Sequence, residues 1–261
     1  VDTAITALDD IFIDHRFGKA GAKVVIEDFL EGQEFSLMSF VRGTEFWPMP
    51  ISQDHKRAYD NDEGPNTGGM GAYSPVPQIG QDVIDTAIDT IVRPTVEAMA
   101  AEGTPFTGIL YAGLIATAER PQGHRIHAPL RRPPKPKSSS PSLTSDLGAA
   151  ISAILDGGLP AFTWDSDNAT LGVVLASNGY PVNVIKGAKI PSIPVDDAPH
   201  VYYAGVSNSD QGLVASSGRV LLIETTAPRP QVAQDKVYAI IDKLDTEGMF
   251  YRHDIGAKAL K

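Results

Sequence analysis

The chain has 261 residues, a formal net charge of -10 and no cysteine. Its length allows one large domain or two small ones, and a hydrophobic fraction of 42% with a charged fraction of 21% excludes global disorder. The negative charge argues against general nucleic-acid binding, and the apolar runs are too short to cross a membrane. The lack of cysteine excludes disulfides and thiolate metal sites and favours a cytoplasmic setting.

The first half of the chain predicts a mixture of helices and strands. Residues 2–13 have apolar side chains at helical spacing directly after a first residue that is not methionine, so we expect a piece of a longer protein. Residues 52–77 are polar and rich in Gly, Pro and Asn, which predicts a long functional loop. The remaining predictions are strands over 23–27, 35–41, 45–49 and 107–117, the middle two joined as a hairpin, and a helix over 82–102 that Pro94 kinks.

The second half changes in character. Residues 120–143 contain six Lys or Arg and six Pro but no acid, which predicts irregular structure. A small β-rich domain closed by one helix is predicted over 165–261, following an α+β domain over 1–164. The elements predicted here are helices over 145–155 and 231–244, and short strands over 171–176, 184–185, 201–204, 213–215 and 220–225.

A strand that runs into a turn over residues 24–34 carries candidate nucleotide-binding groups. Backbone N–H and C=O groups at the end of a strand can pair with the edge of an adenine. A carboxylate a few residues later can accept hydrogen bonds from both ribose hydroxyls. The alternative is an ordinary strand with acidic residues at a hairpin.

Two further segments have the composition of a binding site for a small polar molecule. Asp54, His55, Lys56 and Arg57 put a carboxylate, a titratable ring and two cations in succession, which suits an anionic or zwitterionic substrate. Residues 64–75 contain four glycines flanked by prolines, and the amides of such a loop can converge on an anion. The alternatives are a solvated charged surface and a structural Ω-loop.

Four segments in this order resemble the phosphoribosylamine–glycine ligase (glycinamide ribonucleotide synthetase) family. They read Glu-Asp-Phe-Leu-Glu-Gly from Glu27, Ser-Gln-Asp-His-Lys-Arg from Ser52, Gly-Pro-Asn-Thr-Gly-Gly-Met-Gly-Ala-Tyr-Ser-Pro from Gly64, and Phe-Thr-Gly-Ile-Leu-Tyr-Ala-Gly-Leu from Phe106. Segments at 175–181, 218–221 and 247–256 agree with it. The resemblance implies a partial ATP-grasp domain followed by a small β-rich C-terminal domain.

The resemblance also implies an activity, a ligase reaction of purine biosynthesis. ATP, with Mg²⁺ or Mn²⁺, would join glycine to 5-phosphoribosylamine through a glycyl phosphate, in a cytoplasmic and monomeric enzyme. By motif match, ATP would contact Glu27, Asp28, Phe29, Leu30 and Glu34. The substrates would contact Asp54, His55, Lys56, Asn66, Thr67, Gly68, Gly69 and Gly71.

The chain departs from the family at two places. The family's N-terminal domain and phosphate loop would precede residue 1, and at 120–143 the Glu and Asn that hold the metal in the family are absent. We therefore assign no metal ligand and expect this chain to be inactive as written.

An out-of-frame translation explains the second departure. Codons that fit residues 122–126 read, one base later, as the family's Lys-Val-Ile-Glu-Phe. A genuine basic, proline-rich linker that binds acidic or SH3-like partners is the alternative for this stretch. For the whole chain, the alternatives are another ATP-grasp carboxylate–amine ligase and a non-catalytic remnant.

Overall fold

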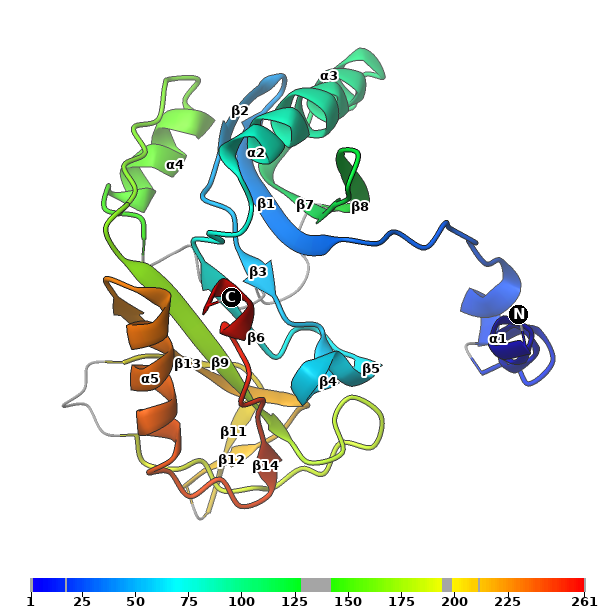
Figure 1. Cartoon of the computed structure of the whole chain (residues 1–261), viewed down its shortest axis with the longest axis vertical. Coiled ribbons are helices and arrows are strands. Elements are labelled where there is room, and N and C mark those ends of the chain that lie inside the picture. The colour runs from blue at the N-terminus through cyan, green and yellow to red at the C-terminus, as the bar shows by residue number, and fades with distance from the viewer. Residues whose placement is uncertain (1, 17, 128–141, 194–198, 211, 261) are drawn as a thin grey trace. The chain divides into compact units, whose positions relative to one another are not determined.

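The computed structural model describes residues 2–16, 18–127, 142–193, 199–210 and 212–260, and it divides the chain into two units, Val1–Glu31 and Gly32–Lys261 (Figure 1). The first unit contains α1 (Asp2–Phe12) and a short 3-10 helix, η1 (Gly18–Ala22). The helix predicted over 2–13 is confirmed. The strand predicted over 23–27 is wrong, because a strand needs a partner for its backbone groups and the described part of this unit offers none.

The second unit begins with an antiparallel sheet of four strands in the order β2-β1-β7-β8. The hairpin predicted from the sequence is confirmed, with Arg42 paired to Glu45 across a turn in which Gly43 has φ +62°. The strand predicted over 107–117 is confirmed as well. The strands are β1 (Gln33–Arg42), β2 (Glu45–Pro48), β7 (Thr107–Ala116) and β8 (Pro121–His127).

Strand β8 corrects one prediction from the sequence. Residues 121–127 were expected to be irregular, yet they pair with β7 from Pro121 opposite Ala116 to His127 opposite Tyr111. The physical reason is the position of β8 at the edge of the sheet, where one side needs no hydrogen-bond partner and a proline at the first residue is tolerated. The prediction of irregular structure covered residues 120–143, and of these, residues 128–141 lie outside the described residues.

A helical segment packs on one face of this sheet and confirms the helix predicted over 82–102. It comprises α2 (Gln81–Ala87), a π-helical turn η3 (Ile88–Val92) and α3 (Arg93–Ala101). The π turn ends two residues before Pro94. Proline has no amide hydrogen to donate, so the regular hydrogen-bond pattern of the helix is interrupted here. Val92 and Val96 share a buried cluster with Phe35 and Leu37 of β1.

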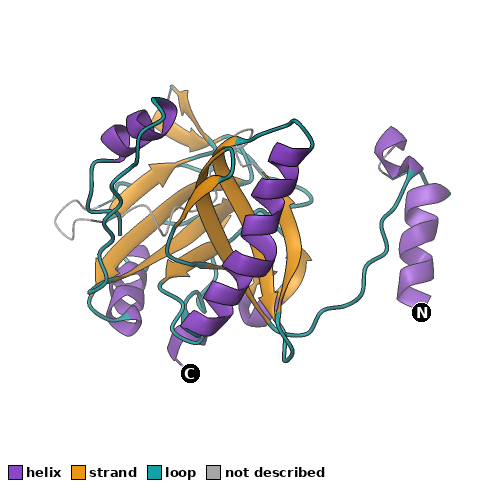
Figure 2. Cartoon of the chain, turned by 90° about the horizontal axis from the view of Figure 1, so that it is seen from above, coloured by secondary structure: helices purple, strands orange, loops and turns teal. Residues whose placement is uncertain are grey.

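The second sheet has the order β10-β13-β9-β6-β3, and β14 also pairs with β9. Helix α5 (Pro230–Ile241) packs against β9 and β13 (Figure 1), and in Figure 2 the helices of residues 32–260 lie on the outer sides of the strands. The strands are β3 (Gln53–Asp54), β6 (Gly71–Ser74), β9 (Ala169–Ser177), β10 (His200–Tyr203), β13 (Arg219–Ala227) and β14 (Met249–Phe250).

Smaller elements complete the described part of the second unit. They are the pair β4 (Arg57–Tyr59) and β5 (Glu63–Asn66), joined by η2 (Asp60–Asp62), the pair β11 (Val206–Ser209) and β12 (Gly212–Ala215), α4 (Leu147–Leu155) and η5 (Ala257–Leu260). The prediction of one loop over 52–77 is therefore wrong, because four short strands form there through pairing that no local pattern encodes. The strand predicted over 184–185 is absent.

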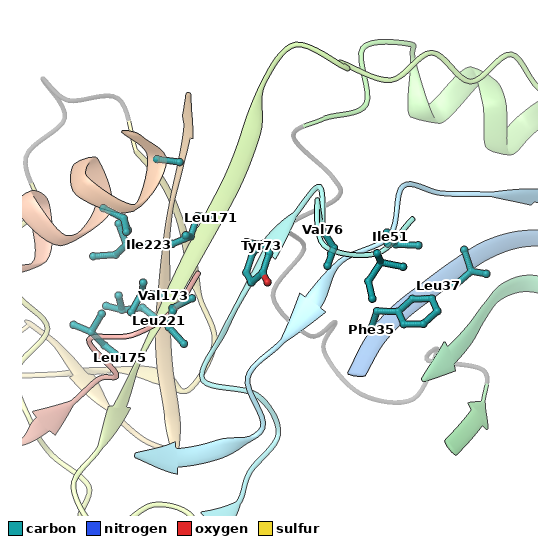
Figure 3. Packing of buried hydrophobic residues seen from close by; sticks show 14 of the residues in the cluster. Phe35, Leu37, Ile51, Tyr73, Val76, Leu171, Val173, Leu175, Leu221 and Ile223 are labelled. Atoms are coloured by element: carbon teal, nitrogen blue, oxygen red, sulfur yellow. The ribbon is translucent and has the colours of Figure 1, made fainter. Parts of the chain in front are cut away.

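The buried side chains form a continuous cluster from the first sheet to the second. Figure 3 shows Tyr73 of β6 between Phe35 and Leu37 on one side and Leu171 and Ile223 on the other. The chain is thus a mixed α+β protein whose C-terminal part is β-rich and carries one α-helix. The domain boundary at 165 stays a prediction. Within the described residues, no helix is long and apolar enough to cross a membrane.

Candidate functional site

A cavity of about 660 Å³ opens where the start of β1 meets the short strands of residues 53–66. Its wall is mixed in charge, since acidic and basic side chains both contribute to it. Such a lining suits a ligand that carries both signs of charge. The lining residues are Gly32, Gln33, Glu34, Gln53, Asp54, Lys56, Arg57, Asp62, Asn66, Gln78 and Lys258.

Glu34 and Lys56 form the ion pair at one side of this cavity. Glu34 is in β1, and its Oε2 accepts a hydrogen bond of 2.5 Å from Lys56 Nζ. Burial by itself lowers the pKa of Lys56, but the hydrogen bond and the charge of Glu34 outweigh it and raise that pKa above its usual value. The backbone of Glu34 is held as well, because its carbonyl accepts a 2.6 Å hydrogen bond from Gln53 Nε2.

Asp54 lies in β3, the edge strand of the second sheet, and faces the glycine-rich loop. A Cβ atom built on Gly69 would lie only 2.5 Å from Asp54 Oδ1, so the carboxylate rests directly against the Gly69 backbone. Gly69 has φ +110°, a conformation that side-chain-bearing residues rarely adopt. The structure therefore brings Asp54 and Asn66 to the same cavity as Glu34, with Gly69 packed against Asp54.

Four amides of the glycine-rich loop donate hydrogen bonds within the protein. Thr67 N donates to Lys56 O at 2.7 Å, and Met70 N donates to His55 O at 2.8 Å. Gly68 N donates to Tyr180 Oη at 2.9 Å, and Gly69 N donates to Thr67 Oγ1 at 3.0 Å. Each of these four amides is bonded inside the protein in this structure, and the predicted contacts of the loop with substrate stay a prediction.

His55 and Gly71 are buried and do not line the cavity. His55 is 2% exposed, and its backbone N–H donates to Gly71 O at 2.9 Å. Burial, followed by the positive charges of Arg252 and Lys258, lowers the pKa of His55 to about 4. The imidazole is therefore neutral at physiological pH.

The C-terminal segment supplies groups that the sequence patterns did not single out. Lys258 Nζ donates to Asp62 Oδ2 at 2.6 Å, and both residues line the cavity. Arg252 is fully buried and donates to Asp62 Oδ1 at 2.9 Å and to Arg57 O at 3.1 Å. These contacts join residues about 190 positions apart, which no local spacing reveals.

The predicted adenine-binding residues belong to the other structural unit. Glu27, Asp28 and Phe29 are exposed in an extended segment, and Leu30 is partly buried. Their predicted contact with ATP stays a prediction. Glu34 is the residue of the predicted ATP set that lies at the described cavity.

The described residues offer no metal centre. No group of three or more His, Asp or Glu side chains among them is placed to hold a metal ion. We therefore assign none of these residues to a divalent cation.

The fold class follows from comparison with known proteins. The model of the phosphoribosylglycinamide synthetase ATP-grasp (A) domain matches residues 1–125, and that of the C domain of the same protein matches residues 170–258. The biotin carboxylase domain of Hydrogenobacter thermophilus 2-oxoglutarate carboxylase shares the fold, with a TM-score of 0.66 at 9% identity over 95% of this chain and 53% of that one. The chain is thus a member of the ATP-grasp class.

The particular family is the phosphoribosylglycinamide synthetase family, to which the chain belongs. A phosphoribosylamine–glycine ligase from Streptococcus pyogenes is 48% identical over 100% of this chain, and one from Streptococcus suis is 46% identical. The solved phosphoribosylamine–glycine ligase of Thermotoga maritima superposes with a TM-score of 0.77 at 32% identity, over 88% of this chain and 57% of that one. The chain spans 62% of the length of the streptococcal relatives.

Proposed function

We propose that the chain is part of a ligase that uses ATP to join glycine to 5-phosphoribosylamine, giving glycinamide ribonucleotide, ADP and phosphate. Family membership supports the reaction, and the cavity of mixed charge at Glu34, Asp54 and Lys56 is the observation that carries the site. Glycine is a zwitterion and the second substrate is a phosphate ester. The lining of the cavity contains carboxylates that can pair with an ammonium group and cations that can pair with a carboxylate or a phosphate.

The proposed reaction has two steps. The carboxylate of glycine attacks the γ-phosphate of ATP, which forms glycyl phosphate and releases ADP. The amine of 5-phosphoribosylamine then attacks the acyl carbon, forms the amide bond and expels phosphate. The family uses a divalent cation with ATP, and we propose none of the described residues as a ligand of that ion.

Asp54 is the proposed partner of the glycine ammonium group. A charge-assisted hydrogen bond between an ammonium and a carboxylate is among the stronger polar contacts in proteins, and Asp54 stands at the cavity wall with its position fixed by Gly69. Glu34, also on this wall, is proposed to accept hydrogen bonds from the ribose of ATP. Lys56, held by Glu34, and Arg57 are proposed to face the anionic groups of the substrates.

The cellular setting is part of the same proposal. The substrates are small polar metabolites and the chain has no cysteine, so we propose a cytoplasmic enzyme. We propose, from the resemblance to the family, that it acts as a monomer.

The experiment is a kinetic comparison in the full-length protein, after the DNA over residues 120–143 has been resequenced. ADP release is measured with glycine, 5-phosphoribosylamine, ATP and Mg²⁺, each omitted in turn. Release that requires both substrates supports the proposal, and release without the amine contradicts it. Asp54→Asn keeps the size and removes the charge, and we expect it to raise the KM for glycine roughly 10- to 100-fold.

Glu97→Gln is the matched control, because it makes the same change of carboxylate to amide on the exposed surface of α3. It is expected to leave the KM for glycine unchanged. The midpoint of urea unfolding should differ little between the two variants. Unchanged glycine kinetics in Asp54→Asn would remove Asp54 from the site while leaving the family assignment intact.

A further inference from the structure

We propose that Tyr180 and Arg219 are positioning residues that hold the glycine-rich loop, and through it Asp54, in place at the cavity. Both come from the C-terminal part of the chain, 112 and 151 residues from the loop residue that they bind. Neither lines the cavity. The expected effect on the KM for glycine rests on the proposed function, whereas the effect on the loop does not.

The two side chains bind the two polar groups of one residue, Gly68. Tyr180 Oη accepts a 2.9 Å hydrogen bond from Gly68 N, and Arg219 Nη1 donates a 2.7 Å hydrogen bond to Gly68 O. A Cβ atom on Gly68 would lie 2.9 Å from Arg219 Cζ, so the guanidinium fits against a residue without a side chain. These two hydrogen bonds hold both the N–H and the C=O group of Gly68, and we call the pair of side chains, Tyr180 and Arg219, the clamp.

Each of these two side chains is itself held by the second sheet or the turn beside it. Arg219 is the first residue of β13, and its backbone pairs with β9 opposite Ala176. The ring of Tyr180 packs on Gly218, where a Cβ atom would lie 2.2 Å from the ring. The two hydrogen bonds to Gly68 therefore connect the loop to the second sheet through Arg219 and to the turn at Gly218 through Tyr180.

The position of the loop decides the position of Asp54. Gly69 follows the clamped residue directly, and the carboxylate of Asp54 rests on its backbone. The next residue, Met70, is fully buried, and its carbonyl accepts a 2.9 Å hydrogen bond from Val174 N of β9. Residues 68–70 thus run as a short bridge between the clamp and the sheet. Loss of the hydrogen bonds at Gly68 would therefore let the backbone of Gly69 move, and with it the carboxylate of Asp54 that packs against Gly69.

The first test uses the chain itself and needs no ligand. Tyr180→Phe keeps the ring on Gly218 and removes the acceptor of Gly68 N, while Arg219→Met removes the donor to Gly68 O. In each variant we expect the amides of Gly68 and Gly69 to exchange hydrogen about tenfold faster, since one hydrogen bond is lost. The amide of Val173 in β9 should keep its exchange rate.

Controls and a rescue separate the clamp from a general effect on stability. Tyr203→Phe and Arg229→Met make the same chemical changes at exposed positions and are expected to leave the loop amides unchanged. Arg219→Lys keeps one donor and is expected to recover part of the protection. Equal acceleration at Val173 would show a structural role alone and would overturn the proposal, as would unchanged exchange at Gly68 and Gly69.

The second test reads Asp54 directly. The ¹³C resonance of its carboxyl group, identified by its loss in Asp54→Asn, is expected to shift in Tyr180→Phe and Arg219→Met and to stay in place in the two control variants. In the full-length enzyme, the same variants are expected to raise the KM for glycine about tenfold with a smaller change in kcat.

The two tests fail separately. A resonance of Asp54 that does not move contradicts the clamp whatever the enzyme binds. A moved resonance with unchanged glycine kinetics leaves the clamp in place and contradicts the proposed role of Asp54.

Discussion

Glu224 in β13 is a carboxyl group with no exposed surface. Burial raises its pKa to about 8, and the contact with Tyr202 lowers that pKa only in part. His200 Nδ1 lies 3.7 Å from its Oε1, on the neighbouring strand β10. Gly172, which faces Glu224 from β9, brings no charge. At neutral pH the folded protein therefore favours the protonated form of this acid.

The raised pKa predicts how the stability depends on pH. An acid whose pKa is higher in the folded state stabilises the fold fully below its unfolded value of about 4.5, and this contribution is lost as the pH rises through about 8. Glu224→Gln should remove that loss and increase the free energy of unfolding at pH 8 by on the order of 3 kcal/mol relative to the unsubstituted chain. At pH 4.5 the two proteins should agree.

Urea unfolding at pH 5, 6.5 and 8 measures this difference. Glu97→Gln, on the exposed surface of α3, is the control and should follow the unsubstituted chain at every pH. A Glu224→Gln variant that also follows it would contradict the assignment of a buried, protonated Glu224.

The site residues that the sequence could predict stand in short motifs, Glu34 in the segment that begins at Glu27 and the others further along the chain. Asp54 and Lys56 are two positions apart, and Asn66 follows in a motif with an unusual number of glycines. Asp62 and Lys258 carry no such signal, because they meet only when the C-terminal segment folds back over η2. The hydrogen bond from Gly68 N to Tyr180 could not be predicted from the sequence for the same reason, because the two residues are 112 positions apart.

The C-terminal segment after β14 is held to η2 and its neighbours by a set of ion pairs. Arg252 donates to Asp62 at 2.9 Å and to Asp254 Oδ2 at 2.6 Å, and Asn61 N donates to the same Asp254 Oδ2 at 2.9 Å. Burial by itself raises the pKa of Asp62, but hydrogen bonds from Lys258 and Arg252 outweigh it and lower that pKa to about 2. The pairs therefore stabilise the fold above about pH 4, and this contribution is lost as the pH falls towards 2.

Arg252→Met should destabilise the protein, because two carboxylates lose their common partner while the volume is kept. Removing one member of a buried pair costs about 3–5 kcal/mol, and the partial exposure of Asp62 and Asp254 reduces the expected loss to about 2–3 kcal/mol. Urea unfolding at pH 7 measures it. Arg93→Met removes an exposed pair between Arg93 of α3 and Asp89 of η3 and should cost under about 1 kcal/mol. Equal effects of the two substitutions would contradict the importance of the C-terminal pairs.

Elements with a strong local period were predictable, and those made by pairing were not. The spacing of apolar residues in 82–102 was enough for a helix, although not for the π turn before Pro94. Strands β3 to β6 have two to four residues each, too few for a period. Strand β6 adds to β9 and β3 adds to β6, whereas β4 and β5 pair with each other. Strand β8 was missed because the many prolines and cations of residues 120–143 oppose a central strand, whereas its own Pro121, at the first residue of an edge strand, is tolerated.

The two sheets of residues 32–260 share one buried cluster, which bears on how the molecule unfolds. Strand β6 precedes residue 165 and β9 follows it, yet Gly71 to Ser74 pair with Val173 to Thr170. Tyr73 of β6 is buried between the two sheets (Figure 3). Segments on either side of the predicted boundary thus contribute neighbouring strands to one sheet. We expect them to unfold in a single transition.

Leu175→Ala tests this expectation from the side of the second sheet. Leu175 lies in β9 with no exposed surface, so the loss of its side chain should cost about 2–5 kcal/mol. Both tryptophans, Trp47 and Trp164, belong to a cluster on the first sheet, and their fluorescence reports unfolding there. If the core is one cooperative unit, the fluorescence transition moves to lower urea together with the loss of amide protection in β13. Leu159→Ala, at a side chain that is 79% exposed, should move neither. A variant that loses protection in β13 while the fluorescence midpoint stays in place would instead show two domains that unfold independently across residue 165.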